Sequence, residues 1–263
     1  MMSIRLFVFF LALPTAAWSH SWEIKAPVHY RQYTEFDDSG KQLNKETGPL
    51  IGVSSALLLN FASIKLKSEM SWSSGTQDYS GATQGGAPLH TDTKQEISAL
   101  SQSFIWAPEA FAGYFFHASL GWNQWDRHIQ ASPNSLALKE RYRWWSSTFG
   151  FGYVNNIGAD HTLTTRLGFN RTSNGTVSPD LRALGLGEPE LNMNDENGGF
   201  ADIEYSYRLN QTSLLSVLLR YEEFGFGKSE EQILLYNGRP VRIGEPRSKT
   251  RVSTVGLSYS RTF

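Results

Sequence analysis

Ala201-Asp-Ile-Glu-Tyr-Ser-Tyr-Arg-Leu209 alternates apolar and polar side chains at every step. Ile203 and Tyr205 fall on one face of an extended chain, whereas Asp202 and Glu204 fall on the other. A period of two is typical of a β-strand, because successive side chains of a strand point to opposite faces. We therefore predict a strand here with one apolar face and one charged face.

The same alternation recurs along the chain, and helical periodicity is scarce. It predicts about ten strands, with eight or twelve as the alternatives. Each strand is about as long as a tilted strand must be to cross a bilayer, which takes about 9 to 11 residues. The predicted strands lie near residues 22–33, 49–60, 63–75, 93–106, 111–126, 140–154, 161–172, 199–209, 212–226 and 249–263.

The connections between these strands alternate in length. Long polar connections fall near residues 34–48, 76–92, 127–139, 173–198 and 227–248, and tight ones at 60–62, 107–110, 155–160 and 210–212. Alternation alone would also suit a secreted β-sandwich, which is the alternative fold. Long loops at one rim and tight turns at the other indicate an all-β, up-and-down antiparallel transmembrane β-barrel with both termini in the periplasm.

The composition agrees with strands that face lipid on one side and water on the other. The chain holds 8 Trp, 11 Tyr and 16 Phe, yet its mean hydropathy is −0.36. Tyr114 and Trp122 bracket the apolar stretch of one predicted strand, as aromatic girdles do at the two membrane interfaces. A formal net charge of −1 is not the basic charge expected of a nucleic-acid-binding protein. The absence of cysteine excludes disulfides and thiol chemistry.

The first residues have the layout of a secretory signal peptide. A cationic start at Arg5 precedes an apolar run over 6–13, and small residues at Ala17 and Ser19 suit a cleavage site. The run is too short to span a bilayer, which takes about 20 residues as a helix. We predict a cleaved signal peptide over 1–19, a barrel domain over 20–263, and location in the cell outer membrane.

The chain ends in Val255-Gly-Leu-Ser-Tyr-Ser-Arg-Thr-Phe263. This ending resembles the β-signal of bacterial outer-membrane β-barrel proteins, with a terminal Phe263 and alternate apolar or aromatic positions at Tyr259, Leu257 and Val255. Gly256 fits the small residue usual in that pattern, whereas Arg261 departs from its apolar preference. The resemblance implies recognition by the barrel-assembly machinery during insertion, through addition of an unpaired strand.

The polar face of the strands predicts a charged network in the lumen. Both signs are present in near balance, so the side chains either cross-link and fill the barrel or line a narrow polar passage. Barrels of about 8 strands are filled by side chains, which favours a mostly occluded lumen. The predicted network comprises Glu23, Lys25, His29, Arg31, Lys65, Lys67, Glu69, Arg166, Asp202, Glu204, Arg208, Arg220 and Glu222.

No catalytic residue can be assigned from the sequence. Asp160 and His161 are the only adjacent Asp and His, and they fall in a tight turn. Ser173-Asn174 matches part of the His-x-Ser-Asn stretch of outer-membrane lipid hydrolases, but the base position holds Arg171, which cannot accept a proton. Ten strands also suit omptin-like proteases, a likeness of strand number alone.

The predicted function is therefore a non-enzymatic structural, binding or narrow-pore role, without cofactor or metal. The alternative is a membrane-embedded hydrolase at the extracellular rim, which would need His117 or His29 beside a Ser and an acid. The six histidines are dispersed, with no pair at metal-ligand spacing. The expected partners of this monomer are outer-membrane lipid and lipopolysaccharide, to which Glu188, Glu190, Asp195 and Glu196 could be bridged by a divalent cation, although a solvated surface explains them better.

Overall fold

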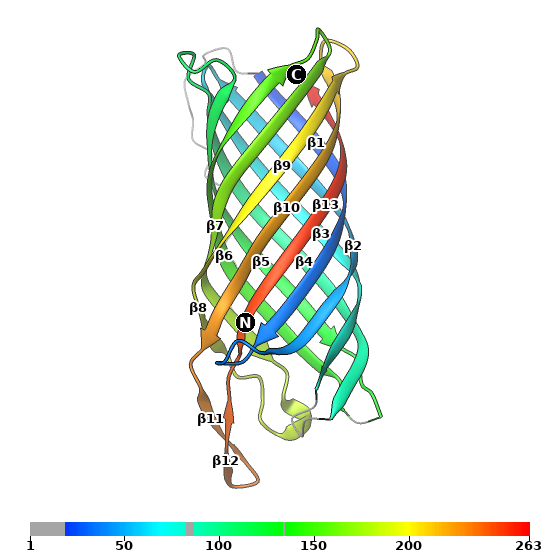
Figure 1. The fold of residues 1–263 in the computed structure, drawn as a ribbon, viewed down its shortest axis with the longest axis vertical. Coiled ribbons are helices and arrows are strands. Elements are labelled where there is room, and N and C mark those ends of the chain that lie inside the picture. The colour runs from blue at the N-terminus through cyan, green and yellow to red at the C-terminus, as the bar shows by residue number, and fades with distance from the viewer. Residues whose placement is uncertain (1–18, 83–86, 134) are drawn as a thin grey trace.

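The computed structural model describes residues 19–82, 87–133 and 135–263, which form a tall barrel of strands (Figure 1). A single turn of 3-10 helix, η1 (Arg182–Leu184), lies between β7 and β8. Among the described residues, no helix is long and apolar enough to cross a membrane. The predicted signal peptide lies outside the described residues except for Ser19. The strands are β1 (Ser19–Phe36), β2 (Gln42–Phe61), β3 (Ile64–Ala82), β4 (Pro88–Trp106), β5 (Tyr114–Ile129), β6 (Leu138–Asn156), β7 (His161–Pro179), β8 (Leu191–Asn194), β9 (Glu196–Arg208), β10 (Ser213–Ser229), β11 (Gln232–Tyr236), β12 (Arg239–Ile243) and β13 (Arg247–Thr262).

Antiparallel pairing closes the sheet into a ring. Each strand from β1 to β7 pairs with the next, and β13 pairs with both β10 and β1. β8 and β9 share one place, because both pair with β7 on one side and with β10 on the other. The ring therefore has about ten places, and the predicted up-and-down antiparallel barrel is confirmed.

The two rims differ as the connections predicted. Tight connections at 62–63, 107–113, 157–160 and 209–212 lie at one rim, together with the start of β1 and the end of β13. We call this rim the turn end and the opposite rim the loop end. At the turn end, His20 stacks on Phe263 with ring centroids 5.5 Å apart, so the final residue packs against the first strand.

An apolar band encircles the turn-end half of the outer wall. On β1 the outward side chains Trp22, Ile24, Val28 and Tyr30 are 39% to 56% exposed, and polar residues follow from Gln32 onward. The band covers 114–122 on β5 and 145–153 on β6, where aromatic side chains again stand at both edges. Exposed apolar side chains around a closed ring are what a lipid-facing wall requires.

The strands run further toward the loop end than the sequence predicted. Residues 34–36, 42–48, 76–82, 88–92 and 173–179 were expected in loops and lie in strands. The reason is that the apolar and polar faces exchange sides above the band. On β5, Trp125 is buried inside while Asp126 faces outward, as in a soluble barrel, so the alternation continues in the opposite phase.

A β-bulge redirects β7 at the segment expected to enter a loop. The β6–β7 register shifts between Arg143 and Trp145, and opposite it Asn174 adopts a left-handed conformation with φ of 49°. Asn tolerates this region better than most residues. Before the bulge Asn170 is buried inside, and after it Val177 is. The bulge thus supplies the loop-end half of the lumen with an apolar side chain.

Candidate functional site in the barrel lumen

The inward side chains at the turn-end half form two ion-paired groups. In the first, Lys67 Nζ lies 2.7 Å from Glu69 Oε2 and 3.0 Å from Glu23 Oε1, and Lys25 Nζ lies 3.4 Å from the same Glu23 oxygen. These side chains are 10% to 25% exposed, so the group borders open space. Lys67 is held between two carboxylates on β1 and β3.

The second group lies on β7, β9 and β10. Arg166 Nε donates to Asp202 Oδ1 at 2.7 Å, while Arg220 Nη1 lies 3.5 Å from Asp202 Oδ2. Arg220 also pairs with Glu222 at 3.1 Å, and Asn170 donates to the Glu222 carboxylate. We call these two groups together the charged layer; they comprise Glu23, Lys25, Lys67, Glu69, Arg166, Asp202, Arg220 and Glu222.

The remaining predicted lumen residues lie apart from the charged layer. Lys65 and Arg208 are exposed near the turn end, Glu204 is half-buried, and none of these three makes an ion pair with another described residue. His29 Nδ1 lies 2.8 Å from Thr254 Oγ1. Arg31 is buried further toward the loop end, where its guanidinium lies 3.8 Å from the Trp125 ring centroid and donates to Gln95.

A cavity of about 360 Å³ occupies the middle of the lumen. Charged side chains such as Lys67, Arg166 and Arg220 line part of it, and Trp144 and Phe224 line its loop-end part. Small hydroxyl side chains on β3 to β6 also line the cavity, and their small size leaves space there. These are Ser71, Ser73, Ser101, Ser103, Ser119, Ser146 and Thr148.

Beyond the cavity, aromatic and aliphatic side chains fill the lumen. Tyr33, Trp125 and Tyr142 have no exposed surface; Trp125 stacks on Tyr142 with centroids 4.5 Å apart and meets Tyr33 edge-on at 5.0 Å. Phe226 reaches the same group from β10, 5.9 Å from Tyr142. We call this group the loop-end core; it comprises Tyr33, Trp125, Tyr142, Trp144, Val177, Leu191, Met193 and Phe226.

A buried cluster of carboxylates surrounds one guanidinium just beyond the loop-end core. Arg127 pairs with Glu46 at 2.6 Å, Glu140 at 2.6 Å and Glu35 at 3.3 Å. Glu245, from the segment between β12 and β13, accepts hydrogen bonds from the hydroxyls of Tyr142 at 2.6 Å and Tyr33 at 3.3 Å. We call Glu35, Glu46, Arg127, Glu140 and Glu245 the mouth cluster.

The mouth cluster was not predicted, since most of its members lie where long loops were expected. One signal could have found the inward ones. Continuing the alternation of β1 past Arg31 places Tyr33 and Glu35 inside. On β5, the same alternation places Trp125 and Arg127 on the inner face. Nothing local marks Glu245, which meets Tyr142 across 103 residues of sequence.

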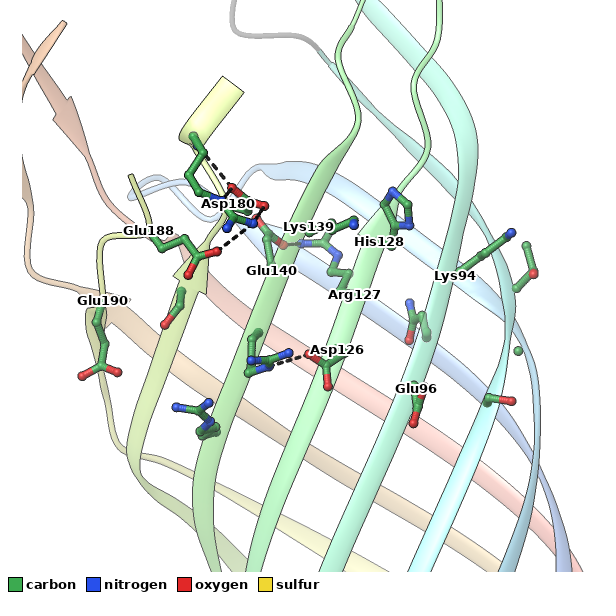
Figure 2. A pocket seen from close by; sticks show the side chains of 18 residues that line it. Lys94, Glu96, Asp126, Arg127, His128, Lys139, Glu140, Asp180, Glu188 and Glu190 are labelled. Atoms are coloured by element: carbon green, nitrogen blue, oxygen red, sulfur yellow. Dashed lines mark hydrogen bonds and ion pairs between the residues drawn. The ribbon is translucent and has the colours of Figure 1, made fainter. Parts of the chain in front are cut away.

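A groove of about 800 Å³ lies on the outer wall at the loop end, between β4 to β6 and the segment 180–190 (Figure 2). Lys94, His128 and Lys139 are cross-strand neighbours along it. Glu188, which was expected on a solvated surface, is 51% exposed and also ion-paired. Arg182 pairs with Asp180 at 2.6 Å and with Glu188 at 3.1 Å, and its hydrogen bonds hold the pKa of Asp180 at about 2.

The other acidic pair of this region is also neutralised by arginine. Asp195 lies 2.9 Å from Arg171, and Glu196 lies 2.8 Å from Arg247. Within the described ranges, no group of three or more His, Asp or Glu side chains is arranged to hold a metal ion.

The two candidate histidines, His29 and His117, make no serine-hydrolase contacts with the described residues. His29 contacts a threonine, and His117 Nδ1 is buried without a hydrogen-bond partner among the described residues. His161 stacks on Tyr205 and Tyr207 at the turn end. Among the described residues, no hydrogen bond joins His29 or His117 to a serine or to an acid.

Comparison with known proteins shows a shared fold. No family model matches the chain, and no curated protein matches it in sequence. Among solved structures, the outer membrane protease OmpT from Escherichia coli aligns with a TM-score of 0.53 and 8% identity, covering 94% of this chain and 96% of that one. The outer membrane protein OprG from Pseudomonas aeruginosa gives 0.44 and 14%, covering 92% and 95%. The P. putida toluene transporter TodX gives 0.36 and 9%, covering 95% and 90%.

The chain has the fold of outer-membrane β-barrel proteins, as the strand pattern and its C-terminal ending predicted. At these identities the likeness establishes the fold alone. A fold does not determine a function, so the role of this barrel has to be argued from its own lumen.

Proposed function

We propose that this protein is a non-enzymatic outer-membrane barrel whose lumen is closed at rest. The observation that carries the proposal is the complete burial of Tyr33, Trp125 and Tyr142, which reach across the lumen from β1, β5 and β6. A passage for hydrated ions would leave these rings wetted. Filling by side chains suits a ring of about ten places, close to the size at which barrels have no channel.

The proposal includes an orientation and a route of assembly. The loop end faces the outside and the turn end the periplasm, as in barrels with long external loops. A signal peptide over 1–19 directs export, and the barrel-assembly machinery reads the last strand. Val255 and Leu257 support this role, since both point outward from β13 and are more than half exposed. Lipid and lipopolysaccharide surround the apolar band of the monomer.

Planar-bilayer conductance of the refolded protein tests the closed lumen. We expect no discrete steps from the wild type. Trp144→Ala should produce them, because this side chain is 6% exposed and separates the central cavity from the rest of the loop-end core. Trp145→Ala is the matched control, since the neighbouring ring is 42% exposed and faces lipid.

Two results would contradict the proposal. Steps in the wild type that change when Lys67 is neutralised would show an open passage through the charged layer. Equal conductance from Trp144→Ala and Trp145→Ala would show that the loop-end core is not the barrier.

A further inference from the structure

The hairpin formed by β11 and β12 extends past the loop end of the barrel as a separate two-stranded sheet (Figure 1). Its base is closed by the Ser229 N–H, which donates to Glu245 O at 2.9 Å, and by the Glu245 N–H, which donates to Ser229 Oγ at 2.7 Å. The hairpin and Glu245 therefore move together. Whatever holds the Glu245 side chain also holds the hairpin against the barrel.

The Glu245 side chain anchors the base of this hairpin inside the barrel. Glu245 is 8% exposed, and its carboxyl group accepts hydrogen bonds from Tyr142 and Tyr33, both fully buried. Ile243, two residues earlier, packs against the loop-end core. Outside the mouth, Gln232 donates to the backbone oxygen of Glu190 at 2.6 Å. Besides its two hydrogen bonds with Ser229, the last residue of β10, Glu245 is attached inside the barrel through its carboxyl group.

The charges that face Glu245 disfavour its ionised form. Glu35 faces it from β1 and Glu140 from β6, along with the Tyr33 and Tyr142 hydroxyls. Arg127, from β5, forms its ion pairs with Glu35, Glu46 and Glu140. In the described chain no cation pairs with Glu245 itself. Burial, followed by the charges of Glu35 and Glu140, raises the pKa of Glu245 well above its ordinary value.

We propose that Glu245 is a proton-dependent latch: its uncharged carboxyl group holds the hairpin in the mouth of the barrel, and loss of the proton releases it. Docking binds the proton, so docking is fully favoured below the ordinary Glu pKa, about 4.3. It weakens as the pH rises through the higher pKa of the docked form. Above the ordinary value, each pH unit within that window lowers the ratio of docked to released hairpin about tenfold.

The latch is a separate proposal from the closed lumen, since it concerns the position of the hairpin and not conduction through the charged layer. The loop-end core is built from wall side chains and stays in place when the hairpin leaves. Release uncovers the other residues of the mouth cluster. Ile233 and Leu235, already 64% and 70% exposed, move away from the barrel with the hairpin.

Spin-label distances can test the latch, because the chain has no cysteine of its own. Leu235→Cys on β11 and Thr76→Cys on the wall of β3 place one label on the hairpin and one on the barrel; both positions are exposed. The pH is raised from about 5 to about 10, the range that buried carboxyls reach. We expect one narrow distance at low pH and a growing second population at high pH.

Two variants of the labelled protein separate the latch from general loosening. Glu245→Gln stays uncharged and keeps an acceptor for Tyr142, so its hairpin should stay docked across the whole range. Glu231→Gln is the control: this residue lies just before β11, is half exposed and pairs with Arg242 at 3.5 Å. It should keep the wild-type transition.

The latch is overturned if the wild-type distance stays constant to the highest pH, or if Glu245→Gln shows the same transition as the wild type. Neither result bears on conductance. A conducting barrel with a pH-dependent hairpin would overturn only the closed lumen, and a silent barrel with a fixed hairpin would overturn only the latch.

Discussion

Lys67 and Arg127 are both inward cations held by more than one carboxylate, yet their surroundings differ. Lys67 is 17% exposed and borders the central cavity, with Glu23 and Glu69 13% and 25% exposed. Arg127 is 2% exposed, and its partners Glu35, Glu46 and Glu140 are 9% exposed or less. One group meets open space in the lumen, and the other is enclosed by protein.

The difference shows how the same ion-pair chemistry serves two purposes in one barrel. Where space for water remains, charges keep part of their solvation, and removing one partner leaves the others tolerably placed. Where protein encloses them, the pair cannot be split without leaving an uncompensated buried charge. The charged layer borders the central cavity, whereas the loop-end core and the mouth cluster are packed beyond it without exposed surface to speak of.

Removing the enclosed cation should have the largest effect. Arg127→Met leaves three buried carboxylates facing one another, and breaking a buried pair in this way costs about 3 to 5 kcal/mol. We expect a loss of that size in the free energy of unfolding from lipid vesicles, measured in urea by tryptophan fluorescence. Lowering the pH should recover part of the loss, because protonation removes the uncompensated charges.

Arg141→Met provides the matched control for this measurement. Arg141 lies on the next strand and pairs with Asp126 at 2.6 Å on the outer wall, where the two side chains are 50% and 38% exposed. Exposed pairs contribute about 0 to 1 kcal/mol. If both arginine variants lost the same stability, the mouth cluster would not be the dry site that its burial indicates.

The same substitution in the charged layer should have a smaller effect. Arg166→Met removes the 2.7 Å partner of Asp202 but leaves Arg220 at 3.5 Å from the other oxygen of that carboxylate. We expect a loss of about 1.5 to 3 kcal/mol, the range of one hydrogen bond to a charged group. A loss as large as that of Arg127→Met would mean that the two halves of the lumen are equally dry.

The turn-end half of the barrel could be predicted from the sequence because its two faces meet different solvents. Trp22 and Ile24 face lipid while Glu23 and Lys25 face the lumen, so the local alternation alone predicts which side chains point outward. All ten predicted strands are present for this reason. The tight turns between them are also where the sequence placed them.

The loop-end half escaped prediction for two physical reasons. Above the apolar band the outside is aqueous and the inside is dry, so the alternation reverses phase and its polar residues suggest a loop. The mouth cluster is also assembled from distant segments: Arg127 and Glu46 are 81 positions apart. Such contacts follow from the register of the closed ring, and no local pattern encodes them.

The smallest expected effect concerns Asp180, whose carboxyl group lies at the same end of the barrel as that of Glu245. Asp180 is partly exposed beside Arg182, and its pKa lies at about 2 because the Arg182 side chain and backbone N–H donate to it. Arg182→Met should return that pKa toward the ordinary Asp value of about 3.9. Carboxyl-carbon NMR titration measures the shift, with Arg239→Met on the hairpin as control.

The sign of the Asp180 shift is opposite to that of Glu245. Any stability that Asp180 contributes is present above the ordinary Asp pKa and is lost as the pH falls through about 2. The latch at Glu245 weakens in the other direction, as the pH rises. If Asp180 titrated near its ordinary value with Arg182 in place, this surface pair would not form in solution. The contrast between a carboxyl paired in water and one buried without a cation would then rest on Glu245 alone.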